Sequence, residues 1–185
     1  DHEWMGGASM AQNGVICNPN IPSEEVFTTP HALRVEGYVS STKPLSHQGT
    51  LIDNIRVVFE KGSITDAKAS KGETVLKKVL ESDEGARRLG EVALVPNSSP
   101  ISNSGLLFYN TLFDENAACH IALGQCYSKC FKGETNLSLS EIRERGGNSS
   151  MIHIDWMIGS GEIDIDGFGK NGEIVPIFRK GEWVD

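Results

Sequence analysis

Apolar and polar residues alternate along several short stretches of the chain, and one stretch repeats its apolar residues at helical spacing. Alternation at every second position is typical of strands that bury one face. The strands expected from it span residues 33–39, 51–59 and 91–95. Between the second and third of these, apolar residues recur every three or four positions and predict an amphipathic helix over residues 73–82.

The second half of the chain shows the same mixture of short elements. Residues 114–120 have a helical pattern, whereas residues 121–124 fit a helix or a strand equally well. Another short helix is expected to begin at Ser138 and to stop at Gly146 and Gly147. The last forty residues are expected to form a meander with strands at residues 151–158, 161–166 and 173–178.

Turn signals separate these elements. Asn13-Gly14 lies between apolar segments and predicts a type I′ hairpin, and residues 170–172 predict a tight turn. Residues 18–23 contain two prolines and should be irregular, because proline removes a backbone donor. Without repeats or a long linker, we expect one continuous domain over residues 1–185. Its predicted class is α+β, a mixed or antiparallel, β-rich and barrel-like domain with a few short helices.

Composition narrows the possible partners. The chain has 185 residues, of which 38% are apolar and 23% charged, so it can build a core. No apolar stretch approaches the roughly 20 residues of a membrane span. The formal net charge of −8 argues against a nucleic-acid surface, which needs clustered lysines and arginines. An excess of carboxylates suits cation binding, or solubility alone.

The cysteines and the first residues bear on location. Cys17, Cys119, Cys126 and Cys130 form no Cys-x-x-Cys pair, so we expect reduced, mostly buried thiols in a cytoplasmic protein. The first residues have neither the basic nor the apolar region of a signal peptide. They lack an initiator methionine and run directly into structured-looking sequence, which suggests a piece of a longer protein.

The most informative polar pair is His153 and Asp155. Side chains alternate across a strand, so these two share one face and could ligate one divalent ion. A polar pair on a strand is also commonly just exposed to solvent, and that alternative stays open.

Three further segments carry candidate ligands, each with a structural alternative. Glu115 and His120 lie five residues apart, near a helix start that acidic residues also favour. Glu91 opens an apolar strand, where a charge can protect an edge. The pair Glu24-Glu25 could simply be an exposed loop. Together these segments supply the carboxylates and imidazoles that suit a dinuclear Zn, Co or Mn hydrolase site.

Five blocks of sequence resemble, in the same order, the signature blocks of the aminopeptidase T, aminopeptidase S and PepS family. They are residues 19–30 (PNIPSEEVFTTP), 85–95 (GARRLGEVALV), 110–117 (NTLFDENA), 120–124 (HIALG) and 153–159 (HIDWMIG). The resemblance spans nearly the whole chain. It covers only the family's C-terminal metal-binding part, since members carry an additional N-terminal α/β domain that this sequence lacks.

The resemblance implies roles for particular residues. Its metal ligands fall on Glu25, Glu91, Glu115, His120, His153 and Asp155. Glu25 is preferred to Glu24 because the acid directly before Val-Phe matches the family ligand. The family's active-site tyrosine matches Tyr127, and a proton-shuttling carboxylate would be Glu91 or Glu25. No role is implied for His31 and His47, which we expect at the surface or in turns.

The function implied is a metallo-aminopeptidase that hydrolyses N-terminal residues from peptides through a water activated by two divalent ions, Zn, Co or Mn. Its partners would be peptide substrates, with no nucleic acid or membrane, and the full-length protein would be a homodimer. Two alternatives remain: another metal-dependent amide hydrolase, such as a deacetylase, and a folded but inactive fragment.

Overall fold

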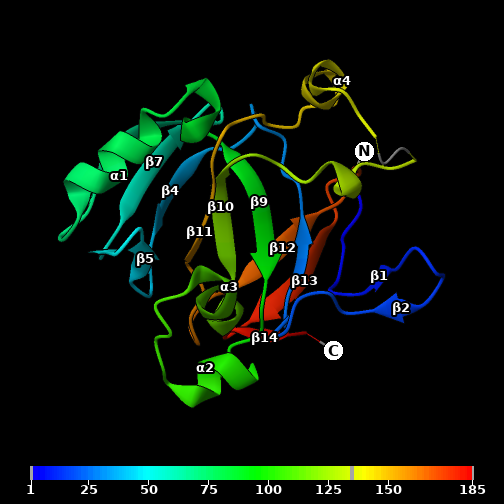
Figure 1. The fold of residues 1–185 in the computed structure, drawn as a ribbon, viewed down its shortest axis with the longest axis horizontal. Helices are drawn as coiled ribbons and strands as arrows, with labels where there is room; N and C mark the ends of the chain where they lie inside the picture. The colour runs from blue at the N-terminus through cyan, green and yellow to red at the C-terminus, as the bar shows by residue number, and fades with distance from the viewer. Residues whose placement is uncertain (1, 134–135, 185) are drawn as a thin grey trace.

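A four-stranded antiparallel sheet lies at the centre of the protein (Figure 1). The computed structural model describes residues 2–133 and 136–184. The central sheet has the strand order β11-β10-β9-β3. Its strands are β3 (Val26–Thr28), β9 (Leu89–Leu94), β10 (His120–Gly124) and β11 (His153–Met157).

Smaller antiparallel sheets surround the central one. One three-stranded sheet has the order β4-β7-β8, another has the order β12-β13-β14, and two hairpins pair β1 with β2 and β5 with β6. These strands are β1 (Ser9–Met10), β2 (Ile16–Cys17), β4 (Gly37–Ser40), β5 (Leu45–His47), β6 (Thr50–Ile52), β7 (Arg56–Glu60), β8 (Ser63–Lys68), β12 (Ile165–Phe168), β13 (Ile174–Arg179) and β14 (Glu182–Trp183). The α+β class is confirmed, and the described strands form several open sheets rather than one closed barrel.

The helices are short. They are α1 (Glu73–Leu80), α2 (Pro100–Ser104), α3 (Thr111–Asp114) and α4 (Leu139–Glu144), with 3-10 turns η1 (Glu84–Arg87), η2 (Glu115–Ala117) and η3 (Ser128–Cys130). The amphipathic pattern over residues 73–82 correctly predicted α1, which buries Leu76 and Leu80. The Ser138 side chain caps α4 in a capping box with Glu141, as its sequence pattern favours. None of the described helices is both long and apolar enough to cross a membrane.

One face of the central sheet packs into the main core. On β10, Ile121 and Leu123 point to this face, and Trp156 of β11 lies opposite Ile121. They pack with buried residues of α1 and with Val57 of β7, and α1 and β7 lie beside the sheet in Figure 1. Because side chains alternate along a strand, the neighbouring positions on β9, β10 and β11 must point to the other face.

Several boundaries differ from the sequence expectation. The strand expected at 33–39 begins only at Gly37, and the one expected at 51–59 is divided into β6 and β7 by a turn with Asn54 at φ 50°. The helical pattern at 114–120 gives only the end of α3 and η2 before β10 starts at His120. The ambiguous residues 121–124 are strand.

The first hairpin forms with a different turn from the one predicted. Its strands are β1 and β2, but the Gly14 N–H donates to the Ala11 carbonyl at 2.9 Å, so the turn is centred on Gln12 and Asn13. Gly14 follows it at φ 82°, the arrangement of a three-residue loop rather than a type I′ turn. Residues 18–23 lie outside strands and helices, as expected from their prolines.

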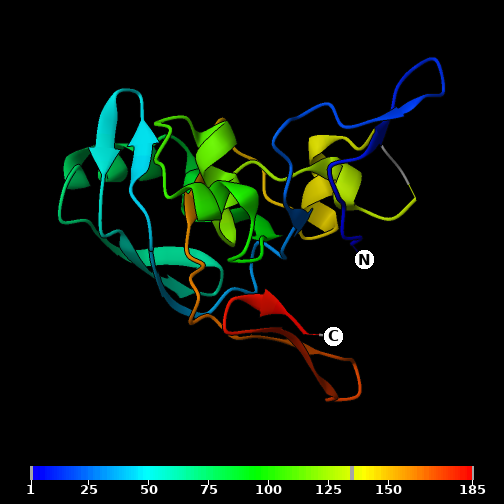
Figure 2. The same ribbon diagram turned by 90° about the horizontal axis from the view of Figure 1, so that it is seen from below.

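The C-terminal strands do not form one meander. β11 joins the central sheet by pairing with β10, whereas β12, β13 and β14 form their own sheet. The tight turn expected at residues 170–172 is present, with the Gly172 N–H donating to Gly169. Figure 2 shows the β12–β13 and β1–β2 hairpins projecting away from the body of the protein. The thiols are free, with Cys17 exposed and the other three buried.

Candidate metal centre

The two faces of the central sheet differ: one packs into the apolar core, and the other carries polar side chains. His120, Ala122 and Gly124 alternate along β10, so all three lie on this face. Ala122 is opposite Glu91 of β9 and Asp155 of β11, and Gly124 is opposite His153. The small residues on the middle strand leave the space above them to the longer side chains of its neighbours.

Gly124 is required for this arrangement. Its φ is 101°, a conformation that residues with a Cβ rarely adopt, and a Cβ there would lie 2.1 Å from the Ile152 carbonyl oxygen. The chain bends here and turns towards Tyr127.

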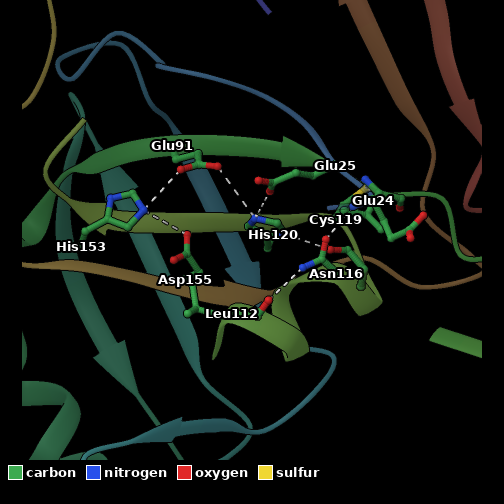
Figure 3. Close-up of polar contacts among 11 residues, drawn as sticks. Glu24, Glu25, Glu91, Leu112, Asn116, Cys119, His120, His153 and Asp155 are labelled. Atoms are coloured by element: carbon green, nitrogen blue, oxygen red, sulfur yellow. Dashed lines mark hydrogen bonds and ion pairs between the residues drawn. The ribbon is translucent and has the colours of Figure 1, made fainter. Parts of the chain in front are cut away.

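Two further carboxylates lie outside the strands of the sheet. Glu25 directly precedes β3, and Glu115 begins η2. Glu24 is exposed and points away from the cluster, whereas the Glu25 carboxylate lies beside His120 (Figure 3).

The structure brings all six expected ligand residues together. His120 Nε2 lies 2.9 Å from Glu25 Oε2 and 3.9 Å from Glu91 Oε1. His153 Nε2 lies 3.3 Å from Glu91 Oε2 and 3.4 Å from Asp155 Oδ1. Three overlapping groups result, each with ligand atoms within 4.8 Å of one another: Glu25-Glu91-His120, Glu91-His153-Asp155 and Glu115-His120-Asp155.

Both imidazoles are oriented by backbone carbonyls. His120 Nδ1 lies 3.1 Å from the Ala118 carbonyl oxygen, and His153 Nδ1 lies 2.7 Å from that of Gln125. A carbonyl oxygen can only accept, so Nδ1 carries the proton in both rings. Each neutral ring then offers the lone pair of Nε2 to the cluster, the arrangement common among metal-bound histidines.

Two carboxylate oxygens in the cluster, Glu25 Oε2 and Asp155 Oδ1, are buried, and their polar neighbours are the Nε2 atoms of His120 and His153. While the rings are neutral and protonated on Nδ1, these Nε2 atoms have no proton to donate, and both oxygens lack a hydrogen bond. Burying a charged oxygen without a partner is costly. Oxygen and imidazole donors converging on a common space therefore fit divalent metal ions, which would satisfy both oxygens.

The pKa values respond to the same crowding of negative charge. Burial raises the pKa of Glu115 to about 8, and the neighbouring carboxylate of Asp155 adds to the effect. Burial also raises the pKa of Glu91. Burial alone would lower the pKa of His120, but its hydrogen bond to Glu25 and the nearby carboxylates raise it to about 9. Asp155 and Glu91 likewise outweigh burial at His153 and raise its pKa to about 11.

The Tyr127 side chain packs beside this cluster. Its ring centroid lies 4.8 Å from that of His153 and 5.6 Å from that of Phe27. Burial and the carboxylates, Glu91 first among them, raise the pKa of its phenol. The hydroxyl therefore keeps its proton at neutral pH and can act as a hydrogen-bond donor.

The cluster lines a cavity of about 370 Å³, which lies within the usual size range of ligand pockets. Sequence reasoning missed two of its basic residues. His47, at the end of the β5–β6 hairpin, lines the cavity, and so does Lys129, whose ammonium lies over the Phe27 ring. No sequence signal indicated His47, because the folding of a distant hairpin against a site leaves no local pattern. His31 lies in a turn, where its Nδ1 accepts the Leu33 N–H.

Comparison with known proteins agrees with this site. The family described as thermophilic metalloprotease (M29) matches residues 1–183. Aminopeptidase T of Thermus aquaticus is 55% identical over 183 residues, which are 99% of this chain and 44% of that protein. Aminopeptidase 2 of Geobacillus stearothermophilus is 53% identical over 183 residues, with the same two shares.

A solved structure gives the same result. Wild-type AmpT from Thermus thermophilus matches this chain with a TM-score of 0.94 and 52% sequence identity, over 100% of this chain and 45% of that one. The chain thus spans less than half the length of these relatives. The expected family resemblance is confirmed: the chain belongs to the thermophilic metalloprotease (M29) family.

Proposed function

We propose that this chain forms the metal-binding part of an aminopeptidase, an enzyme that removes N-terminal residues from peptides. The observation that carries the proposal is the convergence of four carboxylates and two imidazoles, six potential ligands, on one cavity. Relatives that share more than half of the aligned residues are named aminopeptidases.

Two divalent ions would be held by Glu25, Glu91, Glu115, His120, His153 and Asp155. Because three ligand groups overlap, several of these side chains contribute to more than one group. The donors are carboxylates and imidazoles without a thiolate, which suits Zn, Co or Mn. Bound there, such ions supply Lewis acidity, which polarises a carbonyl and makes a water acidic near neutral pH.

Glu91 is our candidate for moving the proton. Its carboxylate lies between the two imidazoles, with Oε1 3.9 Å from His120 Nε2 and Oε2 3.3 Å from His153 Nε2, at the centre of the cluster. It would accept a proton from the attacking water and deliver it to the leaving amine. Glu25, the second candidate, is less deeply buried and lies at the edge of the cluster.

Tyr127 would act on the carbonyl oxygen. Its protonated hydroxyl stands beside the cluster and can donate a hydrogen bond to the oxyanion that develops during attack.

Other expectations remain proposals for the whole protein. The chain would be the C-terminal part of a longer enzyme, with an additional N-terminal α/β domain. That enzyme would be a cytoplasmic homodimer that binds neither nucleic acid nor membranes.

The substrate class can be tested directly. We expect the full-length protein to release amino acids from substrates with a free N-terminal amine after Zn, Co or Mn is added back to chelated protein. N-acetylated versions of the same substrates should stay intact. Both reactions can be followed by chromatography of the products. Hydrolysis of the acetylated substrates alone would favour another amide hydrolase, and turnover by neither would contradict the proposal.

The adjacent acids Glu24 and Glu25 provide a matched pair. Glu25→Gln should lower bound metal by about one ion per chain, because it removes a carboxylate that faces His120. Glu24→Gln should leave metal content unchanged, because that side chain is exposed and points away. Elemental analysis of dialysed protein measures both, with circular dichroism as the check on folding. Equal metal content in the two variants would contradict the assignment of Glu25.

The metal-free protein should lose stability as the pH rises from about 7 to 9. In the fold, the pKa of His120 rises from 6.5 to about 9 and that of Glu115 from 4.5 to about 8. The folded state therefore holds more protons than the unfolded state in this window, and the stability from those protons is lost on deprotonation.

Divalent ions replace the protons as the positive charge, so with metal the decline should be shallower. Thermal unfolding across this range, with chelator and with Mn²⁺, measures both curves. A metal-free melting temperature that stays level or rises would show that the cluster does not act in this way.

Tyr127→Phe should lower kcat in the full-length protein by about 10²–10³-fold, the scale for losing one oxyanion donor. KM should change little, because the hydrogen bond forms in the transition state. Metal content should not change, since the phenylalanine ring can keep the contacts with His153 and Phe27. Full kcat with metal retained would mean that the tyrosine only packs, and loss of an ion would place its oxygen among the ligands.

A further inference from the structure

Asn116 is a buried polar residue next to the proposed metal site that the mechanism does not use. It lies in η2 directly after Glu115, and its residue exposure is 1%. A buried amide destabilises the fold unless its donor and acceptor are hydrogen-bonded. The partners of this amide therefore indicate which segments it fixes in place.

Its side chain joins η2 to the loop before β3, two segments that are far apart in the sequence. Asn116 Oδ1 accepts the Glu24 N–H at 2.7 Å, across 92 positions of the chain. Its Nδ2 donates to the Leu112 carbonyl at 3.1 Å, and its own carbonyl accepts the Ser99 hydroxyl at 2.8 Å. Figure 3 shows Asn116 between the Glu24 backbone and the end of α3.

The residues on either side of this link are proposed ligands. Glu24 is followed by Glu25, and Glu115 precedes Asn116 itself. Residues 18–25 lie outside regular structure, and within the described residues the Glu24 N–H bond is the backbone anchor directly before Glu25. One amide thus ties the segment that carries Glu25 to the segment that carries Glu115, in addition to the pairing of β3 after Glu25 and the α3 bonds of Glu115.

One of the three ligand groups needs no such link. Glu91, His153 and Asp155 all lie on β9 and β11, whose places are set by ladder hydrogen bonds to β10. Glu25 and Glu115, in contrast, lie outside the strands of the central sheet, and Asn116 connects the segments that carry them.

We infer that Asn116 is a positioning residue for one ion of the pair, holding Glu25 and Glu115 around His120 while the ion at His153 depends on the sheet. This inference rests on the dinuclear site proposed above. Partners that orient metal ligands typically change metal affinity by about 10- to 100-fold when they are removed.

The test compares metal titrations of the full-length protein and its variants by calorimetry with Mn²⁺. Asn116→Leu removes both hydrogen bonds of the side chain. It should lower the affinity of the protein for one of the two ions by about 10- to 100-fold. The second ion should keep its affinity within about threefold, a difference below 1 kcal/mol. Asn116→Asp keeps an acceptor for the Glu24 N–H and should restore most of the lost affinity.

Two further variants exclude a general loss of stability. Leu76→Ala removes a buried side chain of α1, away from the cluster, and should destabilise the fold without separating the two affinities. The second variant is His153→Ala, which should lower the affinity for the ion at His153. Adding Asn116→Leu to it should lower the affinity for the ion that remains.

The outcomes are distinct. The inference is overturned if Asn116→Leu binds both ions with the affinities of the unchanged protein. It is also overturned if Asn116→Leu lowers both affinities equally, the pattern of a general loss of stability that Leu76→Ala is used to detect. If the unchanged protein binds a single ion, the dinuclear proposal fails. Asn116 is then judged on that ion: weakening in Asn116→Leu with recovery in Asn116→Asp supports the positioning role, and any other pattern overturns it.

Discussion

Four carboxylates share one cavity in this protein, and their mutual repulsion can be relieved only by positive charge. Glu25, Glu91, Glu115 and Asp155 surround two imidazoles on one face of a small sheet. Without metal, the charge must come from protons. The hydrogen bond to Glu25 and the nearby carboxylates outweigh burial and raise the pKa of His120 to about 9, whereas burial, with repulsion from Asp155 added, raises that of Glu115 to about 8. Divalent ions can supply the same charge and free the imidazole nitrogens as ligands.

The central sheet makes this crowding possible by separating two opposed environments. Ile121 and Leu123 of β10 belong to the apolar core, while His120 and Ala122 face the carboxylates. Ala122 is fully buried between Glu91 and Asp155. A larger side chain there would occupy the space in which the carboxylates meet, so the smallness of Ala122 is part of the site.

The sequence predicted local features of the site better than its assembly. The spacing of His153 and Asp155 placed both on one strand face, and α1 followed from its apolar pattern. Register could not be read, because the pairing of Ala122 with Glu91 and Asp155 depends on contacts between distant strands. The family resemblance supplied the grouping instead, including the preference for Glu25 over Glu24.

Residues that reach the site only through tertiary contacts left no signal in the sequence. Asn116 is buried because two loops meet there, and His47 reaches the cavity through a hairpin whose direction the local pattern does not specify. The strands after β11 were assigned to the wrong sheet for the same reason: alternation predicts a strand but not its neighbour.

The order of pairing in the central sheet has a consequence for folding. β3, β9, β10 and β11 come from widely separated parts of the chain, and no short segment contains three of the proposed ligands. A zinc finger gathers its ligands locally and folds around the ion. Here the long loops must close and the strands must pair first, which is the slower, non-local part of folding. A metal ion that needs ligands from several of these strands can find its full ligand set only after they have paired.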